Sequence, residues 1–401
     1  MSDQQLSKNL SSDQQQITAD LQALLRERIQ TDGPMPFVDY MNACLYEPGL
    51  GYYVNGLSKL GADGDFVTAP ELSSSFAACV ASQIADVFNS ESFTGSARDI
   101  LEFGAGSGQL ACDVLKALER MQALPGRYYI LDVSGQLAAS QQQLLRKQLK
   151  PSLINRIEWI QKLPESFSGV AVANEVFDAF PVERFVIKGK TAERVTVEYK
   201  TGSSSTGGFV TDSVPCVQTQ RKVDSLAHSL RQPFPDGYTS EYCNLLGPWW
   251  SSMAEVMQQG LVLVCDYGCE QAGYYSSARS SGTLRCFFRH GVHNDALVFA
   301  GIQDITADVD FTALTQAAVD AGFELDGYTP MSQFMLGNNV LEHHQSMLKD
   351  APLPQQIAAT GKLKQLLLPQ EMGERFMVAG YSVGLQEPMR GFSLADWSRL
   401  L

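Results

Sequence analysis

The stretch "DILEFGAGSGQL", residues 99–110, joins an apolar strand to a helix through a turn of alternating glycines. Glycine permits the left-handed backbone of a tight turn and lets a ligand approach the main chain. The helix that follows adds free N–H groups at the same point. The GxGxG spacing of Gly104, Gly106 and Gly108 is not the GxGxxG dinucleotide fingerprint, and no GK[ST] of a P-loop follows. The stretch predicts a ligand-binding turn at the edge of a parallel sheet.

Strands and helices alternate on both sides of this turn. Apolar helices are expected from residue 72 to about 88 and from 109 to 121. Further strands are expected at 127–134, 156–160, 169–175, 260–268, 323–329 and 375–383, with helices at 135–149 and 310–323. Such alternation predicts an α/β, Rossmann-like fold with a mainly parallel sheet and helices on both faces.

Two regions fall outside this alternation. Residues 1–71 carry an amphipathic helix at 14–30, a second helix from about Pro36, and a long loop rich in Gly, Tyr and Pro. Residues 184–259 begin with alternating strands and Gly/Ser turns, which predict an inserted antiparallel hairpin followed by a helical region. We therefore divide the chain into an N-terminal helical segment with a covering loop, 1–71, and a main domain, 72–401, with an insertion at 184–259.

The composition excludes some classes of function. The formal charge of −14 argues against a nucleic-acid binder, which would carry a basic surface. No apolar run reaches the roughly 18–20 residues of a membrane span. Residues 1–16 match neither a signal peptide nor a transit peptide, so we expect a cytoplasmic location. The 8 cysteines form no CxxC pair and the 5 histidines no HExxH, so no metal site is expected.

Two acids near the glycine turn indicate which kind of ligand it binds. Glu102 lies two residues before Gly104, where a carboxylate suits a ligand with an ammonium group and repels a pyrophosphate. Asp132 ends the next strand, where an acid usually holds a ribose diol. An amino-acid end together with a ribose describes S-adenosyl-L-methionine. A nicotinamide dehydrogenase and a plain structural turn are the alternatives.

The segment "VAVANEVFDAFPV", residues 170–182, places acids where a buried strand ends. The carboxyl ends of parallel strands border the ligand site, so Asn174 and Glu175 should reach it, with Asp178 one helical turn further. Carboxylates can grip a guanidinium and aim one nitrogen at a methyl group. Alternatively, Asp178 caps a helix and Glu175 pairs with Arg184. An acid/base pair or a metal site fits the neighbouring residues less well.

Other residues are weaker candidates. Phe177 and Phe180 could wall the site, with at least one of them in the core. Asp266 ends a strand near the same edge, and Asp310 has the position of a helix N-cap. A further cluster could contact an acidic peptide or the cofactor carboxylate, or be a solvated loop; it comprises Arg285, Arg289, His290 and His293.

Several motifs together resemble the MidA family of class I S-adenosylmethionine-dependent methyltransferases. They are "FVDYMNACLYEPGLGYY", "GADGDFVTAPELS", "LEFGAGSGQL", "ANEVFDAFPV", "GTLRCFFRH", "GIQDITADVDFTAL" and "LLLPQEMGERF", spread over about residues 35 to 380. The family includes a mitochondrial assembly factor of respiratory complex I. The resemblance implies a seven-stranded methyltransferase sheet and, from the mitochondrial member, symmetric dimethylation of a protein arginine.

The resemblance also assigns residues. It puts the cofactor motif on Gly104, Gly106 and Gly108, with Asp132 in place of a glutamate. It implies that the loop "GDFVTAPE" closes over the cofactor, with contacts from Thr68, Pro70 and Glu71. Asp308 stands where the family motif "AHVDF" has a histidine, so a role of that histidine does not carry over.

The leading hypothesis is an S-adenosyl-L-methionine-dependent methyltransferase that modifies an arginine of a protein substrate, a respiratory-complex subunit or another protein. Glu175 and Asp178 would be the catalytic residues. Glu102, the three glycines, Asp132, Asn174, Thr68 and Pro70 would bind the cofactor. The alternatives are a small-molecule methyltransferase and a non-catalytic, cofactor-binding assembly factor. The sequence carries no signal for an oligomeric state.

Overall fold

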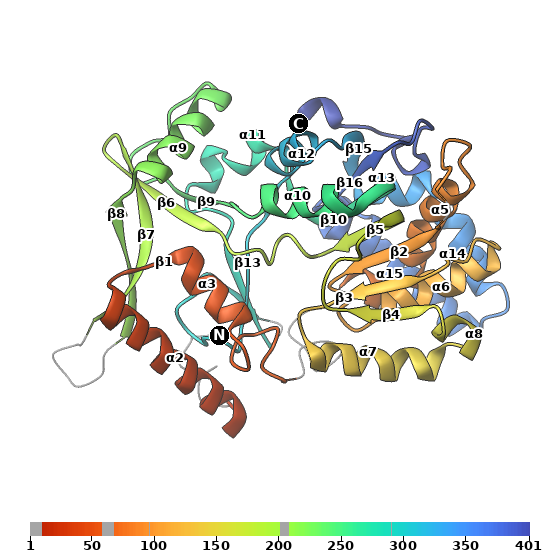
Figure 1. The fold of residues 1–401 in the computed structure, drawn as a ribbon, viewed down its shortest axis with the longest axis horizontal. Coiled ribbons are helices and arrows are strands. Elements are labelled where there is room, and N and C mark those ends of the chain that lie inside the picture. The colour runs from red at the N-terminus through yellow and green to blue at the C-terminus, as the bar shows by residue number, and fades with distance from the viewer. Residues whose placement is uncertain (1–9, 58–67, 96, 201–207, 290) are drawn as a thin grey trace.

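The computed structural model describes residues 10–57, 68–95, 97–200, 208–289 and 291–401. These residues form two lobes that lie side by side (Figure 1). A central sheet with helices on both faces makes up the first lobe. The second lobe contains two smaller sheets and the N-terminal helices. No helix in the described ranges is long and apolar enough to cross a membrane.

The central sheet has the expected parallel core. Its strands follow the order β15 (Glu324–Pro330), β16 (Phe376–Val383), β10 (Met257–Cys269), β5 (Phe167–Asn174), β2 (Asp99–Phe103), β3 (Tyr128–Leu131) and β4 (Ile157–Ile160). Strands β10, β5, β2, β3 and β4 run parallel, whereas β16 is antiparallel to both of its neighbours. The short β14 (Val309–Asp310) adds a pairing to the end of β10. This confirms the predicted seven-stranded methyltransferase sheet, with β14 as an addition.

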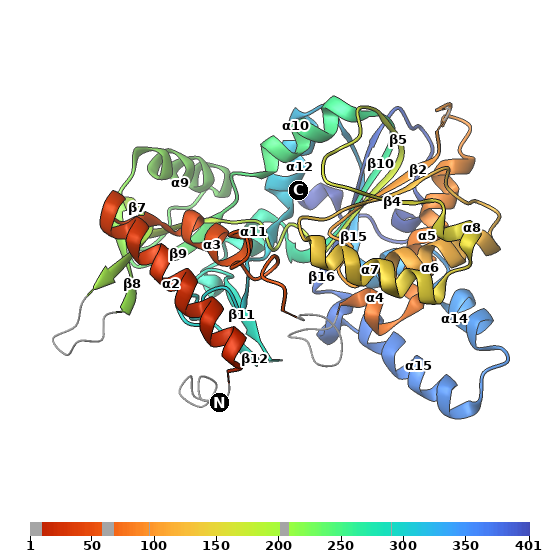
Figure 2. The ribbon, with the colours of Figure 1, turned by 60° about the horizontal axis from the view of Figure 1, so that its bottom comes forward.

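Apolar side chains alternate between the two faces of this sheet. In β10, Leu261 and Leu263 face one core and Val262 and Val264 face the other. The first core is covered by α5 (Ser74–Asn89), α6 (Gln109–Arg120), α7 (Gly135–Gln148), α13 (Met331–Gly337) and α15 (Leu353–Leu367). The second is covered by α10 (Leu246–Val256) and α12 (Phe311–Asp320), above the sheet in Figure 2. Burial on both faces explains why the central strands are almost continuously apolar.

The helices between β15 and β16 were not foreseen from the sequence. They are α13, α14 (Val340–Leu348) and α15, followed by a single turn at Pro369–Gly373. α14 packs on α5, where Ser82 Oγ lies 2.9 Å from His343 Nε2. Short helices α4 (Ala69–Leu72) and α8 (Pro151–Ile154) complete this lobe.

The second lobe is assembled from three separate parts of the chain. Its larger sheet contains β1 (Met35–Pro36), β6 (Glu183–Lys188), β7 (Thr191–Lys200), β8 (Gly208–Pro215) and β9 (Thr239–Tyr242). The smaller sheet contains β11 (Arg285–Phe288), β12 (Gly291–His293) and β13 (Asp304–Thr306). Helices α2 (Ser12–Asp32), α3 (Phe37–Tyr46), α9 (Val217–Leu230) and α11 (Gln271–Tyr274) cover them.

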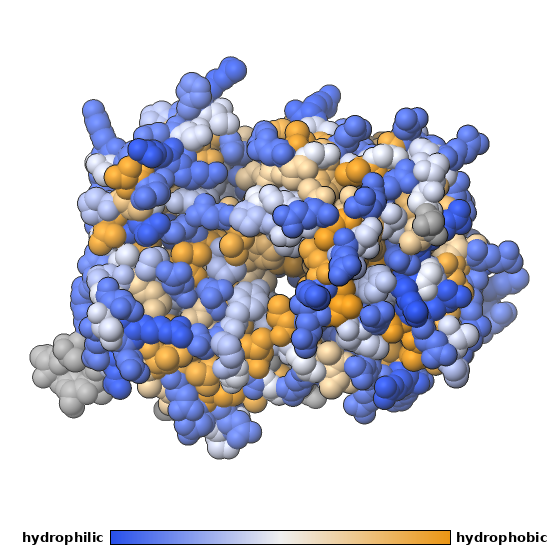
Figure 3. Space-filling model, in the orientation of Figure 1, coloured by the Kyte–Doolittle hydropathy of each residue, from blue (hydrophilic) through white to orange (hydrophobic). Residues whose placement is uncertain are grey.

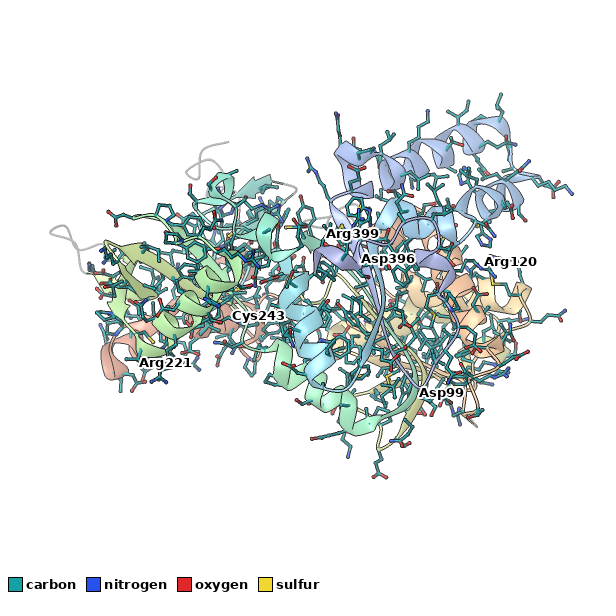
Figure 4. The ribbon with its side chains drawn as sticks, turned by 90° about the horizontal axis from the view of Figure 1, so that it is seen from above. Asp99, Arg120, Arg221, Cys243, Asp396 and Arg399 are labelled. Atoms are coloured by element: carbon teal, nitrogen blue, oxygen red, sulfur yellow. The ribbon has the colours of Figure 1, made fainter. Side chains whose placement is uncertain are left out.

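The chain crosses between the lobes several times. Figure 4 shows Cys243 at the crossing, Arg221 in the second lobe and Asp99 in the first. α10 follows this crossing and packs on the central sheet, although it lies within the segment 184–259 that the sequence analysis set apart. The antiparallel pairings β6–β7 and β7–β8 confirm the hairpin expected there. The boundaries 1–71 and 72–401 stay a prediction.

Two glycines let the central strands approach each other closely. Gly260 in β10 lies opposite Gly169 in β5, and both have positive φ, 142° and 147°. A Cβ on Gly260 would lie 1.8 Å from the carbonyl oxygen of Gly169. No side chain fits there, so the glycine is required by the register of the sheet.

We expect Gly260→Ala to lower the free energy of unfolding by about 3–4 kcal/mol, because the new methyl group must push β10 away from β5. Urea unfolding followed by circular dichroism measures this loss. Gly361→Ala is the matched control: it lies in α15 with nothing within 4 Å of its added Cβ, so it should be neutral or gain about 0.5–1 kcal/mol. Equal urea midpoints for the two variants would show that the close approach of Gly260 to Gly169 does not exclude a side chain.

Candidate active site

A cavity of about 580 Å³ lies at the carboxyl ends of β2, β3 and β5, between the two lobes. The surface is hollowed at this place, near the centre of Figure 3. Most of the residues expected at the site line it: Thr68, Pro70, Glu71, Glu102, Gly104, Gly106, Asp132, Asn174 and Glu175. Gly108 and Asp178 are not among the lining residues.

The glycine turn has the backbone that its sequence predicts. Gly104, Gly106 and Gly108 have φ angles of 58°, 53° and 84°, in the left-handed region. Gly108 begins α6 and faces Gln141 of α7, whose side chain would lie 3.3 Å from an added Cβ. Gly108 therefore serves the packing of two helices, while Gly104 and Gly106 leave their main chain open to the cavity.

Asp132 is held in place by a network that the sequence analysis missed. One carboxylate oxygen accepts the N–H of Ser134 at 3.0 Å, and the other accepts Gln141 Nε2 at 2.9 Å. Gln141 also donates to the Gly106 carbonyl at 3.0 Å and accepts from Trp159 Nε1 at 2.9 Å. Burial raises the pKa of Asp132 above its ordinary value. Because a carboxylate accepts about four hydrogen bonds, Asp132 can also accept those of a ribose diol.

Glu102 is buried, with an exposed fraction of 2%, yet it lines the cavity. The Tyr128 hydroxyl donates to it at 2.7 Å. Burial raises its pKa to about 7, although that hydrogen bond acts in the opposite direction. A carboxylate in such a place gains from a cationic partner, and the ammonium of an amino-acid ligand provides one.

Glu175 presents one oxygen to the cavity and has the other anchored. Its Oε1 accepts from Ala69 N at 3.3 Å and from Asn174 Nδ2 at 3.1 Å, while Oε2 has no hydrogen-bond partner among the described residues. Burial, followed by the charge of Asp266, raises the pKa of Glu175 to about 8. The predicted pairing with Arg184 is wrong, because that guanidinium lies beside Glu241 at 3.8 Å.

Asp178 lies behind the lining, in a turn. No helix begins here, so the alternative that Asp178 is a helix cap is wrong. Its carboxyl has no hydrogen-bond or ion-pair partner within the described ranges, although Arg285 is near enough to act on it. Burial, then the charges of Asp266, Asp304 and Glu175, raises its pKa well above the ordinary value. The cavity thus borders a group of carboxylates with little positive charge nearby.

Aromatic residues of both lobes also line the cavity, and those of the second lobe were not expected from the sequence. Tyr46 and Tyr53 stack with ring centroids 5.5 Å apart. The Tyr46 hydroxyl donates to the Ala179 carbonyl, and the Tyr53 hydroxyl donates to Asp304 Oδ1, both at 2.9 Å. Phe180 lines the cavity beside them. The stretch that carries these tyrosines, "LYEPGLGYY", was the only available signal.

Phe177 belongs to the core. It is 4% exposed and contacts Trp249 of α10 edge to face, with ring centroids 4.9 Å apart. Trp249 in turn lines the cavity. The expectation that at least one of Phe177 and Phe180 is a core residue is confirmed.

The second candidate cluster lies outside this lining. Arg285 and Arg279 both pair with Asp308, and Arg285 stacks 4.1 Å from the Tyr267 ring centroid. Arg289 donates to Gln14 of α2 at 3.0 Å. Nothing is described for His290, and residues 64–67 of the covering loop are likewise outside the described residues.

Two remaining expectations concern Asp310 and metals. Asp310 is the N-cap of α12, as predicted, and accepts from Ala313 N at 3.1 Å. In the ranges that the structure describes, no group of three or more His, Cys, Asp or Glu side chains could hold a metal ion.

The fold and the glycine turn define a methyltransferase of the Rossmann-like type, and sequence comparison agrees. The family described as "Putative S-adenosyl-L-methionine-dependent methyltransferase" matches residues 79–329. A crystal structure from Burkholderia thailandensis, solved with S-adenosyl-homocysteine, is 33% identical and covers 98% of this chain and 99% of its own, with a TM-score of 0.89. The chain belongs to this family of S-adenosyl-L-methionine-dependent methyltransferases, which confirms the resemblance to the MidA family and the predicted cofactor.

Curated relatives extend the comparison. The protein arginine methyltransferase NDUFAF7 of Danio rerio is 27% identical over 383 residues, which is 88% of this chain and 84% of the relative. The Homo sapiens protein of the same name is 26% identical over 384 residues, which is 88% of this chain and 81% of the relative. Both are described as mitochondrial, which contradicts the cytoplasmic location expected from the sequence. That expectation rested on a missing targeting pattern, and a missing pattern is weak evidence for any compartment.

We propose that Glu102 receives the ammonium group of the cofactor. Its pKa of about 7 then makes binding pH-dependent, because the cation binds to the ionised carboxylate. Below pH 7 the carboxyl must lose a proton before it can bind, so affinity should fall about tenfold per pH unit. Calorimetry with S-adenosyl-homocysteine between pH 5.5 and 8.5 measures this slope.

Glu102→Gln should weaken binding and flatten the slope. Asp326→Asn is the matched control, since Asp326 also has a pKa raised by burial to about 7 but lies on β15 beside Ser382, away from the cavity lining. A slope that persists in Glu102→Gln would assign the titration to another group.

Proposed function

We propose that the protein transfers methyl groups to an arginine side chain of a protein substrate. The observation that carries this proposal is a surplus of acceptor oxygens without donors at one end of the cavity. Asn174 Oδ1 and Glu71 Oε2 are buried and have no hydrogen-bond partner among the residues that the structure describes. Glu175 Oε2 and the Asp178 carboxyl add further acceptors close by.

The charges of the lining point in the same direction. It contains the four carboxylates of Glu71, Glu102, Asp132 and Glu175, and among its described residues Lys162 is the one Lys or Arg. Burying acceptors and carboxylates without partners costs free energy, and a ligand with many donors removes that cost. A guanidinium offers five N–H donors in one plane and stays charged, so it matches these acceptors better than a lysine ammonium, which has three donors.

The names of the relatives support the same substrate class. Proteins from Danio rerio and Homo sapiens that align over most of this chain are described as protein arginine methyltransferases. A protein substrate follows from that name. The aromatic wall of Tyr46, Tyr53 and Phe180 suits the planar guanidinium as well, because its flat face can stack on rings.

The residues present determine how the reaction would proceed. When bound, S-adenosyl-L-methionine supplies an electrophilic methyl group on its sulfonium. Glu175 and Asp178 orient the guanidinium so that one nitrogen faces that group, which is mainly a positioning task. The attacking nitrogen gains the methyl carbon as the carbon–sulfur bond breaks with its electron pair left on sulfur. The nitrogen loses one proton, and a carboxylate beside it can accept that proton.

We expect Glu175→Gln and Asp178→Asn each to lower kcat/KM for methylation about 100-fold or more, because each removes a charge that holds the guanidinium. Radiolabelled methyl transfer into a lysate, followed by mass spectrometry of the modified residue, measures the activity and its target. Both variants should still bind S-adenosyl-homocysteine.

The matched control is Glu158→Gln, on the exposed side of β4, which should keep full activity. Label on lysine or on small metabolites would contradict arginine methylation and favour another acceptor. Cofactor binding without any transfer would favour a non-catalytic assembly factor. Arginine labelling unchanged in both site variants would refute the role of the two carboxylates.

A further inference from the structure

Asp266 binds the turn that carries the two proposed catalytic residues. Its side chain is fully buried, and it follows Cys265 of β10, which pairs with Asn174 at the end of β5. Its Oδ2 accepts the N–H groups of Val176 at 3.0 Å, Phe177 at 2.8 Å and Asp178 at 3.4 Å. The other oxygen accepts Tyr267 N at 2.8 Å. One carboxylate therefore takes the place of strand partners that β5 lacks beyond its last residue.

Cys265 and Asp266, two consecutive residues of β10, together fix the conformation of Glu175. The N–H of Glu175 donates to the Cys265 carbonyl at 2.9 Å, so the four consecutive N–H groups of residues 175–178 are all bound by Cys265 and Asp266. Glu175 itself has a φ of 54°, which is unfavourable for a residue with a side chain. Such a conformation persists only when its surroundings enforce it, and it is typical of functional sites.

We propose that Asp266 is a positioning residue which holds the Glu175–Asp178 turn through its hydrogen bonds to the backbone and, as the carboxyl of the pair that ionises first, keeps Asp178 protonated until the cationic substrate arrives. This inference rests on the proposed function, because it describes how the same carboxylates are prepared for a guanidinium. Asp266 does not line the cavity, so it acts through the turn and through its charge on Glu175 and Asp178.

Hydrogen bonding determines which carboxyl of the cluster holds the charge. Asp266 accepts four N–H groups, which favour its ionised form, whereas the Asp178 carboxyl accepts none from the described residues. Burial raises the pKa of both, and the pKa of Asp178 is raised further by the charge of Asp266. Two adjacent buried carboxyls do not both ionise readily.

The other charged groups around Asp178 do not change the order in which the two carboxyls ionise, Asp266 before Asp178. They are Glu175 on the same turn, Asp304 on β13, Arg285 on β11, and the hydroxyls of Tyr46 and Tyr53. Asp304 and Glu175 add repulsion, and Arg285 is already paired with Asp308. A substrate guanidinium would supply the missing positive charge, so its binding should release the proton of Asp178.

The first test uses the wild-type protein without substrate. ¹³C NMR of protein labelled at the aspartate carboxyl carbons follows the titration of each buried group, and Asp178→Asn identifies the signal of Asp178. The inference expects that signal to report a protonated carboxyl at pH 7. An ionised Asp178 at that pH would overturn it, whatever the substrate proves to be.

The second test uses Asp266→Asn, in which the side-chain size is kept and the charge is removed. With glutamate carboxyls labelled and Glu175→Gln as the reference for assignment, the midpoint of Glu175 should move to lower pH. In the methylation assay kcat should fall about 10- to 100-fold, the acidic limb of its pH profile should move to lower pH, and the affinity for S-adenosyl-homocysteine should stay within about twofold.

Asp310→Asn is the matched control, since it is a buried strand-end carboxyl that accepts N–H groups but caps α12. It should lower stability without moving the Glu175 midpoint or the pH profile. An unmoved midpoint in Asp266→Asn would refute the inference, even if activity falls. Failure of the proposed function is separate: it would show as label on another acceptor, with the carboxyl titrations unaffected.

Discussion

Buried carboxylates at the carboxyl edge of the central sheet are the constraint on which the site depends. Glu102, Glu175 and Asp266 lie on or directly after three neighbouring strands, and burial raises their pKa values to about 7 or 8. A fold tolerates such groups only if N–H donors, protons or ligand cations compensate them. Here each has a different compensation: the Tyr128 hydroxyl for Glu102, Ala69 and Asn174 for Glu175, and backbone N–H groups for Asp266.

The parallel register of the strands brings these carboxylates together at one edge of the sheet. Cys265 pairs with Asn174, and Phe103 pairs with Ala173 and Leu131, so the ends of β5, β2 and β3 lie at one level beside Cys265 of β10. The second lobe then closes the edge with Tyr46 and Tyr53, whose hydroxyls bond to Ala179 and Asp304. The tyrosine wall comes from the N-terminal segment, so this part of the cavity lining depends on residues outside the central sheet.

The sequence was sufficient for the parts of the site that depend on one strand and the turn after it. The glycine turn, Glu102, Asp132 and Glu175 follow from local pattern and from the rule that ligands bind at carboxyl strand ends. What depends on contacts between distant segments could not be foreseen. Tyr46 and Tyr53 lie 133 and 251 residues from Ala179 and Asp304, to which their hydroxyls donate, and Gln141 looks like any polar residue of a helix. The helices between β15 and β16 lack strong caps, which explains why they were missed.

The two ends of the cavity differ in how far their polar groups are already satisfied. At the cofactor end, Asp132, Gln141 and Trp159 form a closed chain of hydrogen bonds, and Tyr128 holds Glu102. At the other end, Asn174 Oδ1 and Glu71 Oε2 have no hydrogen-bond partner in the described part of the chain. A satisfied network is rigid, whereas unsatisfied buried acceptors raise the free energy of the empty state and strengthen the binding of a ligand that bonds to them. The cofactor end is therefore formed by the fold itself, whereas the acceptor end gains most from a ligand that supplies hydrogen-bond donors.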